Sequence, residues 1–202
     1  MAKKRIGTEI RQDQIAEAAL EIVRSGGIQS LSVSAVAKKV GIVPSAIYRH
    51  FKSKSDIVGA VLELIRTRLQ SHFQEVAALD TDALEKLHLL LDRHVGLISA
   101  NNAIPGMIFS GAVVGGNPEK RRQLYEIIEN VIANVSSIVK QGQQEGTIRA
   151  DLPPENAAVA FLGMIQPAAM IWNLSGGDFD LLHHSRQAWK LFSDAIRDDA
   201  SP

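Results

Sequence analysis

The stretch that decides the fold is Val33–Phe51, which reads VSAVAKKVGIVPSAIYRHF. Its first half repeats apolar residues every three or four positions, the spacing of one buried face of an α-helix. Ala37 is small enough to let two helices approach closely, and Gly41 can adopt the positive φ that a sharp bend needs. Ile47 and Phe51 follow at positions that anchor a second helix against the first. The spacing therefore predicts a helix-turn-helix.

The outward face of the second helix carries polar and basic side chains. Pro44 fits the first turn of this helix, because its missing amide hydrogen would have no partner there anyway. An exposed tyrosine beside basic residues supplies the donors that bind DNA phosphates. The same pattern also fits an ordinary helical hairpin with a solvated polar face. The residues opposite Ile47 and Phe51 are Ser45, Tyr48, Arg49 and Lys52.

The sequence around this unit also predicts helices. Ser32 is placed to cap the first helix of the unit, and Ser53-Lys54-Ser55-Asp56 has the pattern of a capping box that opens a long helix to about Ala77. No stretch shows the sustained alternation of a strand, so we expect an all-α fold of about nine helices. The remaining helices are expected at Thr8–Ser25, Asp82–Ala100, Ala103–Ser110, Pro118–Gln144, Pro154–Ser175 and Asp178–Arg197.

Charge is distributed unevenly along a chain that is neutral overall, with 22 basic and 22 acidic residues. Residues 1–54 carry ten Lys and Arg against four acidic residues, so the rest of the chain has a net negative charge. A basic head suits the DNA backbone, whereas an acidic body is repelled by it. Chance clustering on a solvated face is the alternative. We place the boundary between two domains, 8–68 and 69–202, within the long fourth helix.

Composition argues against several classes of protein. The chain has no cysteine, which excludes disulfides and thiolate chemistry. No apolar run follows the basic residues at the start, so we expect no secretory signal and a cytoplasmic protein. The longest apolar stretch, 157–172, looks too short and too interrupted to cross a membrane. His88 and Asp92 share a helix face but lack a third ligand, so we expect no metal, no cofactor and no enzyme.

The segment Val33–Asp56 resembles the TetR (tetracycline-repressor) family, whose signature joins a glycine turn to an aromatic-x-His-Phe-x-x-Lys run. Here that run reads Tyr48-Arg49-His50-Phe51-Lys52-Ser53-Lys54. The resemblance covers about 50 residues and implies an N-terminal three-helix DNA-binding domain followed by a helical ligand-binding and dimerisation domain. It also implies a homodimer on double-stranded DNA, with half-sites about 34 Å apart in a near-palindrome. Repression, relieved by a small apolar ligand, is the commoner habit of the family.

The resemblance assigns roles to particular residues of the head. Tyr48, His50 and Lys54 match positions that bind phosphate, and Arg49 is expected either to read a guanine or to hold a phosphate. The start of the recognition helix matches the base-reading positions, where apolar contact with thymine methyl groups is one mode. Lys3–Arg5 either enters the minor groove as an arm or is a disordered tail. The full set of predicted DNA contacts is Ser32, Ser34, Val43, Pro44, Ser45, Ala46, Tyr48, Arg49, His50 and Lys54.

The body is predicted to hold the ligand and the dimer interface. Pro167, inside a helix, should kink it and open space between apolar side chains, although the same residues at helical spacing also fit a simple core. The family pairs its last two long helices with those of a second copy, here Pro154–Ser175 and Asp178–Arg197. The predicted ligand contacts are His94, Ile104, Met107, Phe109, Tyr125, Phe161, Met164, Gln166 and Trp172. A helical adaptor with non-specific DNA affinity is the alternative function.

Overall fold

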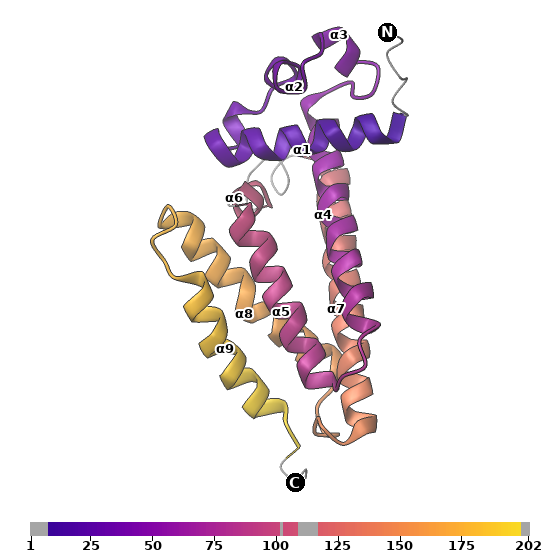
Figure 1. Cartoon of the computed structure of the whole chain (residues 1–202), viewed down its shortest axis with the longest axis vertical. Helices are drawn as coiled ribbons and strands as arrows, with labels where there is room; N and C mark the ends of the chain where they lie inside the picture. Colours follow the sequence, from indigo (N-terminus) through magenta and orange to yellow (C-terminus); the bar gives the residue numbers. More distant parts are fainter. Residues whose placement is uncertain (1–7, 102, 109–116, 199–202) are drawn as a thin grey trace. The chain divides into compact units, whose positions relative to one another are not determined.

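The computed structural model describes residues 8–101, 103–108 and 117–198. Over these residues the chain forms nine α-helices and one short 3-10 helix (Figure 1). The all-α prediction is confirmed, and an isolated bridge between Ile148 and Arg197 is the β pairing recorded for these residues. The elements are α1 (Thr8–Gly26), η1 (Ile28–Ser30), α2 (Val33–Val40), α3 (Pro44–Ile47), α4 (Lys54–Ala77), α5 (Ala83–Ala100), α6 (Ala103–Ile108), α7 (Pro118–Glu145), α8 (Pro154–Leu174) and α9 (Leu181–Ile196).

The chain folds as two compact units. The first contains the described residues up to Thr67 together with those between Asn101 and Tyr125, and the second contains 68–100 and the described residues from Glu126 onward. Both α4 and α7 begin in the first unit and end in the second. The sequence analysis did not anticipate that α6 and the first turns of α7 group with the helix-turn-helix.

The first unit has a core of its own, built on the apolar face of α1. Ile15, Ala19 and Leu20 of α1 are buried. Helix α6 packs against α1 and buries Ile104 and Met107. Apolar residues of α6 that the sequence analysis assigned to a ligand pocket are therefore part of the core of the first unit.

Polar contacts join the first turns of α7 to the start of α4. The side-chain amide of Asn117 donates to the Ser55 hydroxyl at 2.8 Å, and that of Gln123 donates to the Gly59 carbonyl at 2.9 Å. A β-carbon at Gly59 would collide with the side chain of Lys120. The flexible end of the Lys120 side chain thus occupies the space beside Gly59.

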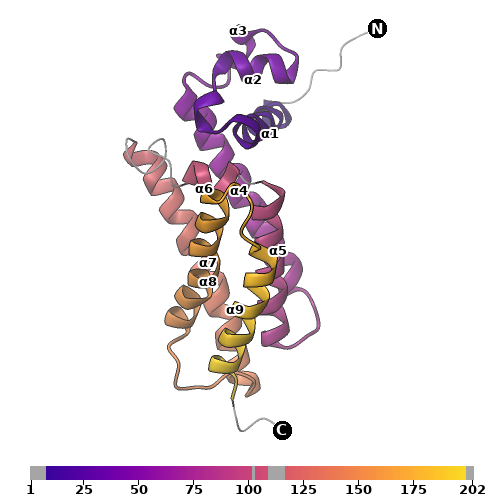
Figure 2. The same cartoon turned by 90° about the vertical axis from the view of Figure 1, so that its left-hand side faces the viewer.

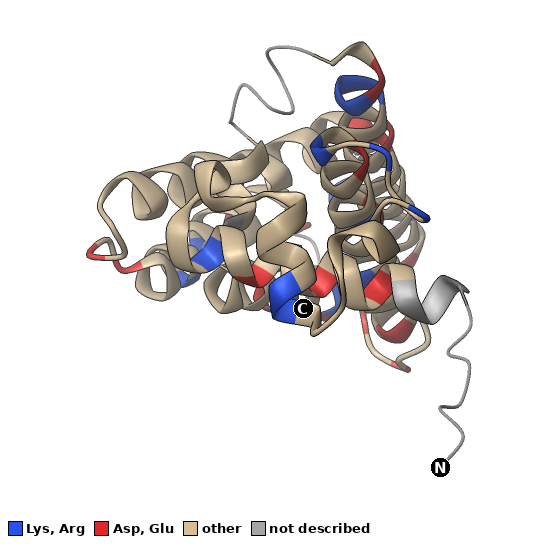
Figure 3. Ribbon diagram, turned by 90° about the horizontal axis from the view of Figure 1, so that it is seen from above, with Lys and Arg blue, Asp and Glu red and all other residues tan. Residues whose placement is uncertain are grey.

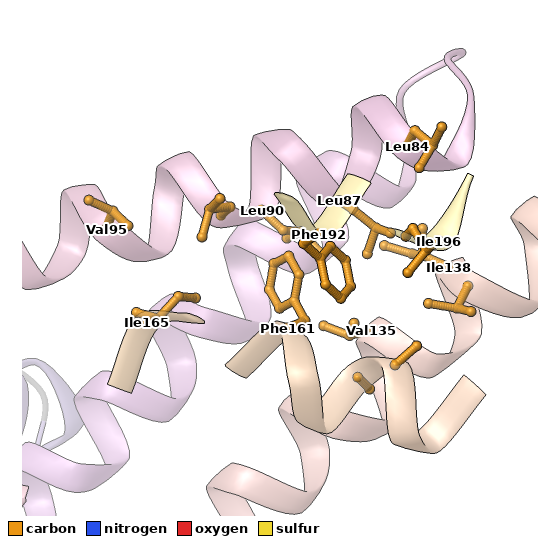
Figure 4. Close-up of a cluster of buried hydrophobic side chains, with 14 of the residues drawn as sticks. Leu84, Leu87, Leu90, Val95, Val135, Ile138, Phe161, Ile165, Phe192 and Ile196 are labelled. Atoms are coloured by element: carbon orange, nitrogen blue, oxygen red, sulfur yellow. The ribbon is translucent and has the colours of Figure 1, made fainter. Parts of the chain in front are cut away.

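The second unit is held together by an apolar core between α5, α7, α8 and α9. Leu87, Phe161, Ile165 and Phe192 are among its buried side chains, and Figure 4 shows Leu87 beside the rings of Phe161 and Phe192. The rings of Phe161 and Phe192 meet edge to face with centroids 5.8 Å apart, a favourable arrangement for aromatic pairs. Helices α8 and α9 pack side by side (Figure 2).

Helix α8 ends one residue before the predicted range, Pro154–Ser175, and is not interrupted at Pro167. It runs through Pro167 and spans 21 residues, and by length and composition it could cross a membrane, with a mean hydropathy of 1.5. The apolar stretch 157–172 lies inside this helix, and length and composition alone do not make it a membrane span. Core helices of soluble proteins meet the same criterion, and α8 buries one face against the core, including Ala158, Phe161 and Ile165.

Candidate nucleic-acid interface and ligand cavity

The bend between α2 and α3 has the geometry that the sequence predicted. Gly41 has φ 75° and ψ 34°, in the left-handed region, and the Ile42 amide donates to the Ala37 carbonyl at 3.0 Å, which closes the end of α2. Ile47 is 0% exposed and Phe51 5%. The two side chains anchor the short helix α3 and the turn after it, so the helix-turn-helix prediction is confirmed.

The opposite face of α3 and its flanks is open to solvent. Val43 is 64% exposed and Tyr48 55%. Of the predicted DNA contacts, Ser32, Ser34, Val43, Pro44, Ser45, Tyr48 and Arg49 are exposed, whereas Ala46, His50 and Lys54 are partly buried. Figure 3 marks the Lys and Arg residues along the ribbon. The structure thus brings most of the predicted contacts to an accessible surface.

Two of these residues also hold the unit together. The Ser32 hydroxyl accepts from the Ala35 amide at 3.1 Å and caps α2. The Lys54 ammonium donates to the Ile28 carbonyl in η1 at 2.9 Å. Lys54 is therefore engaged with the backbone in this structure, a contact that spacing alone did not reveal.

The capping box at the start of α4 is confirmed. The Ser53 hydroxyl accepts from the Asp56 amide at 3.2 Å, and the Asp56 carboxylate accepts from the amides of Lys52 at 2.8 Å and Ser53 at 3.1 Å. These bonds satisfy amide groups that a helix N-terminus leaves without partners. They fix the residue at which α4 begins.

The second unit contains a small cavity between four helices. Each of three helices contributes residues spaced three or four apart, which lie on one helix face. The free space for the centres of water molecules is about 30 Å³, room for about two waters. The lining residues are Leu69, His72 and Phe73 of α4, Leu90 and His94 of α5, Val131, Asn134 and Val135 of α7, and Phe161 of α8.

The cavity includes His94 and Phe161 of the nine predicted ligand contacts. Met164 and Trp172 pack against the core of the second unit, and Gln166 is half-buried. Ile104, Met107 and Tyr125 belong to the first unit, where Tyr125 is 59% exposed. Phe109 lies outside the described residues. Pro167 is exposed, so its ring is directed away from the core.

The two histidines of the cavity are held in their neutral form. Desolvation lowers the pKa of His94 to about 4, with a smaller contribution from His72. Desolvation also lowers the pKa of His72, and the nearby Arg93 and Arg68 act in the same direction while Glu75 opposes them. At neutral pH both rings therefore offer one donor and one acceptor each.

The possible metal pair His88 and Asp92 has a structural explanation. The His88 ring stacks on Trp189 with centroids 4.9 Å apart, and His88 Nε2 lies 3.9 Å from a carboxylate oxygen of Asp92. Among the described residues there is no cluster of three or more side chains that could hold a metal ion. The histidine thus contributes to helix packing.

Sequence comparison shows which known proteins this chain is similar to. Residues 15–61 match the sequence model described as bacterial regulatory proteins, tetR family, and residues 63–195 match the YsiA-like protein, C-terminal region. The fatty acid metabolism regulator protein of Bacillus subtilis (strain 168) is 25% identical over 183 residues, covering 91% of this chain and 94% of the relative. The nucleoid occlusion factor SlmA of Aliivibrio fischeri (strain MJ11) is 21% identical over 188 residues, covering 93% and 96%.

Solved structures share the fold. The transcriptional regulator FadR from Bacillus subtilis, in complex with stearoyl-CoA, superposes with a TM-score of 0.77 at 24% identity, covering 91% of this chain and 98% of that one. The fatty acid degradation regulator FadR from Bacillus halodurans gives 0.79 at 20% identity, covering 94% and 96%. Since the two sequence models together match most of the chain, this protein belongs to the TetR family and is a DNA-binding transcription regulator, not an enzyme.

Proposed function

We propose that this protein is a cytoplasmic, homodimeric regulator that leaves a near-palindromic operator when a long-chain acyl thioester, such as an acyl-CoA, enters the cavity of its second unit. The observation that carries the proposal is the mostly apolar cavity between α4, α5, α7 and α8, in a region that matches the YsiA-like model. Two Bacillus subtilis matches support the ligand class, since one is a fatty acid metabolism regulator and the other was solved with stearoyl-CoA.

The cavity as it stands is too small for such a ligand. A space that holds about two water molecules cannot contain a long hydrocarbon chain, so the helices around it must move apart when the ligand enters. A ligand that binds only the expanded body shifts the population toward that conformation. This is the property that a sensor requires.

Helix α4 offers the route from the cavity to the head. Its second half contributes Leu69, His72 and Phe73 to the cavity wall, and its first residue, Lys54, follows α3 after six residues. A continuous helix moves as a semi-rigid rod, so displacement at one end is felt at the other. We propose that this motion changes the distance between the recognition helices of the dimer and weakens operator binding.

The exposed apolar faces of α8 and α9 are the surface that we assign to dimerisation. The two helices lie side by side (Figure 2), and their exposed large apolar residues range from 42% to 77% exposure. Burial of this surface against a second copy would form a four-helix bundle and would explain why α8 is apolar on both faces. These residues are Val159, Met170, Ile171, Leu174, Leu182 and Leu191.

The ligand response is tested with DNA that the protein itself selects. Selection from random duplexes should enrich a near-palindrome with half-sites about one helical turn apart. Palmitoyl-CoA should then weaken binding to the selected duplex by about tenfold or more in fluorescence anisotropy, a coupling typical of allosteric proteins. Free CoA, which has no acyl chain, is the control. Enrichment of a palindrome with no effect of palmitoyl-CoA would disprove the ligand class.

The predicted contacts of the head divide into two groups with different expected effects. Tyr48→Ala removes an exposed hydroxyl that can donate a hydrogen bond to a DNA phosphate, so it should weaken binding by a similar factor on all sequences. Ser45→Ala alters the base-reading side of α3 and should change which base is preferred at one position of each half-site. Selection repeated with both variants measures the difference, and the same uniform loss from both would contradict the division.

A second candidate function comes from the match to nucleoid occlusion factors. In that case the body would contact a protein partner while the head binds DNA, close to the adaptor alternative. We favour the ligand-responsive regulator because the cavity and the YsiA-like match lie in the same region. A protein that binds its selected DNA equally well with and without every acyl compound would favour the second candidate.

A further inference from the structure

The cavity of the second unit is not uniformly apolar. Six of its nine lining residues are apolar, and the other three are His72, His94 and Asn134. These three come from α4, α5 and α7, so each is held by a different helix. Polar groups from three helices that face one small space are suited to recognise a single polar group.

Among the described residues, one ring nitrogen of His72 lacks a hydrogen-bond partner. This atom, Nδ1, is buried. Buried polar atoms almost always have a partner, because leaving one without a partner costs the free energy of its lost hydration. Because His72 lines the cavity, a ligand that enters it and moves the helices apart can supply the missing partner.

The surroundings of the two rings disfavour a positive charge on either. Arg68 and Glu75 of α4 and Arg93 of α5 are the charged groups that act on His72, and Glu75 is itself paired with Arg93. The residues that α7 and α8 contribute to the wall, Val131, Asn134, Val135 and Phe161, are uncharged. While both histidines stay neutral, no lining residue is charged, so a carboxylate in the cavity has no counter-ion among the residues that it contacts; Arg68 and Arg93 act from outside the lining.

We infer that His72, His94 and Asn134 form a recognition site for an uncharged hydrogen-bonding group on the ligand, such as an ester or thioester carbonyl, and that the site discriminates against a free carboxylate. The inference deepens the proposed function and rests on it for the acyl nature of the ligand. A carbonyl oxygen can accept from a ring N–H or from the Asn134 amide without any change of charge. A carboxylate in the same place would need a proton, taken up either by itself or by a histidine.

The test compares probes that share one hydrocarbon chain. Methyl palmitate, palmitate and palmitoyl-CoA are titrated into the full-length protein at pH 7, below the concentrations at which they form micelles, and affinity is measured by calorimetry. Methyl palmitate should bind about tenfold tighter than palmitate, the difference expected for one buried polar group left unpaired. Palmitate binding should strengthen as the pH falls, because protonation removes its charge, while methyl palmitate binding should not gain in this way.

Variants assign the effect to the residues. His72→Leu and His94→Leu keep apolar bulk in the cavity wall and should each weaken methyl palmitate binding by about tenfold, whereas His94→Gln, which keeps a donor and an acceptor, should restore part of the loss. His88→Leu is the matched control, since His88 also lies on α5 but packs against Trp189 outside the cavity. Thermal melting checks that every variant is folded, and nitrogen NMR of labelled histidine should show a shift of the His72 ring on addition of methyl palmitate.

The outcomes separate the two proposals. Equal binding of ester and acid, or histidine variants that bind like the unmodified protein, overturns the recognition site and leaves the acyl-thioester response standing. Histidine-dependent binding of methyl palmitate without any binding of palmitoyl-CoA supports the recognition site and overturns the proposed ligand. Binding of none of the three probes overturns both.

Discussion

Replacement of Ile47 with alanine is expected to lower the free energy of unfolding of the first unit by about 2–5 kcal/mol, the usual cost of truncating a buried isoleucine. Ile47 is 0% exposed, and α3 has only four residues, Pro44–Ile47, with which to hold its position. A helix this short has little stability of its own and depends on tertiary packing. We therefore also expect operator binding to be lost, although the substituted side chain does not face the DNA.

The matched control for this variant is Val43→Ala, which removes apolar atoms just before the same helix. Val43 is 64% exposed, so its truncation should leave the unfolding free energy within about 0.5 kcal/mol while still altering DNA binding. Urea unfolding followed by circular dichroism measures stability, and anisotropy measures binding. Equal losses of stability from Ile47→Ala and Val43→Ala would show that Ile47 does not anchor the recognition helix.

The parts of this structure that sequence reasoning predicts are those determined by local chemistry. Gly41 at a positive φ, the cap supplied by Ser32 and the capping box of Ser53 and Asp56 each depend on a few neighbouring residues. A local pattern encodes such a feature completely. The helix-turn-helix was predictable because it is a succession of these signals.

The cavity could not be predicted in the same way because it depends on how distant segments pack. His72 and Asn134 are far apart in the sequence and meet only when α4 and α7 lie together. The repeated spacing at Leu69, His72 and Phe73 was visible, but it is equally typical of a simple core face. Pro167, where a kink was expected to open space, is exposed and does not line the cavity.

Individual hydrogen bonds account for two differences between the structure and the sequence predictions. Lys54 matched a phosphate-binding position, yet its ammonium group reaches back across 26 residues to the Ile28 carbonyl. Helix α9 begins at Leu181, where the Asp180 side chain accepts from the His183 amide, and not at Asp178 as predicted. Both differences arise because several acceptors compete for the same hydrogen-bond donor. A periodic sequence pattern does not show which acceptor the donor binds.

Placing glutamate at both Leu174 and Leu191 is expected to weaken the proposed homodimer by roughly a hundredfold or more, because an unpaired charge buried in an apolar interface costs several kcal/mol. The two leucines are 77% and 74% exposed in the single chain, so the substitutions should hardly affect its folding. A monomer contacts one half-site, so operator affinity should fall with the dimer.

Sedimentation equilibrium, combined with anisotropy on the selected operator, measures both effects of this double variant. Leu79→Glu, which adds the same type of charge at a leucine that is 41% exposed between α4 and α5, is the control and should leave the dimer intact. Retention of the dimer by the Leu174→Glu, Leu191→Glu protein would exclude the α8 and α9 face as the interface. Helix α8 is long and apolar enough by composition to cross a membrane. Its apolar outer face would then have to be buried by something other than the four-helix bundle.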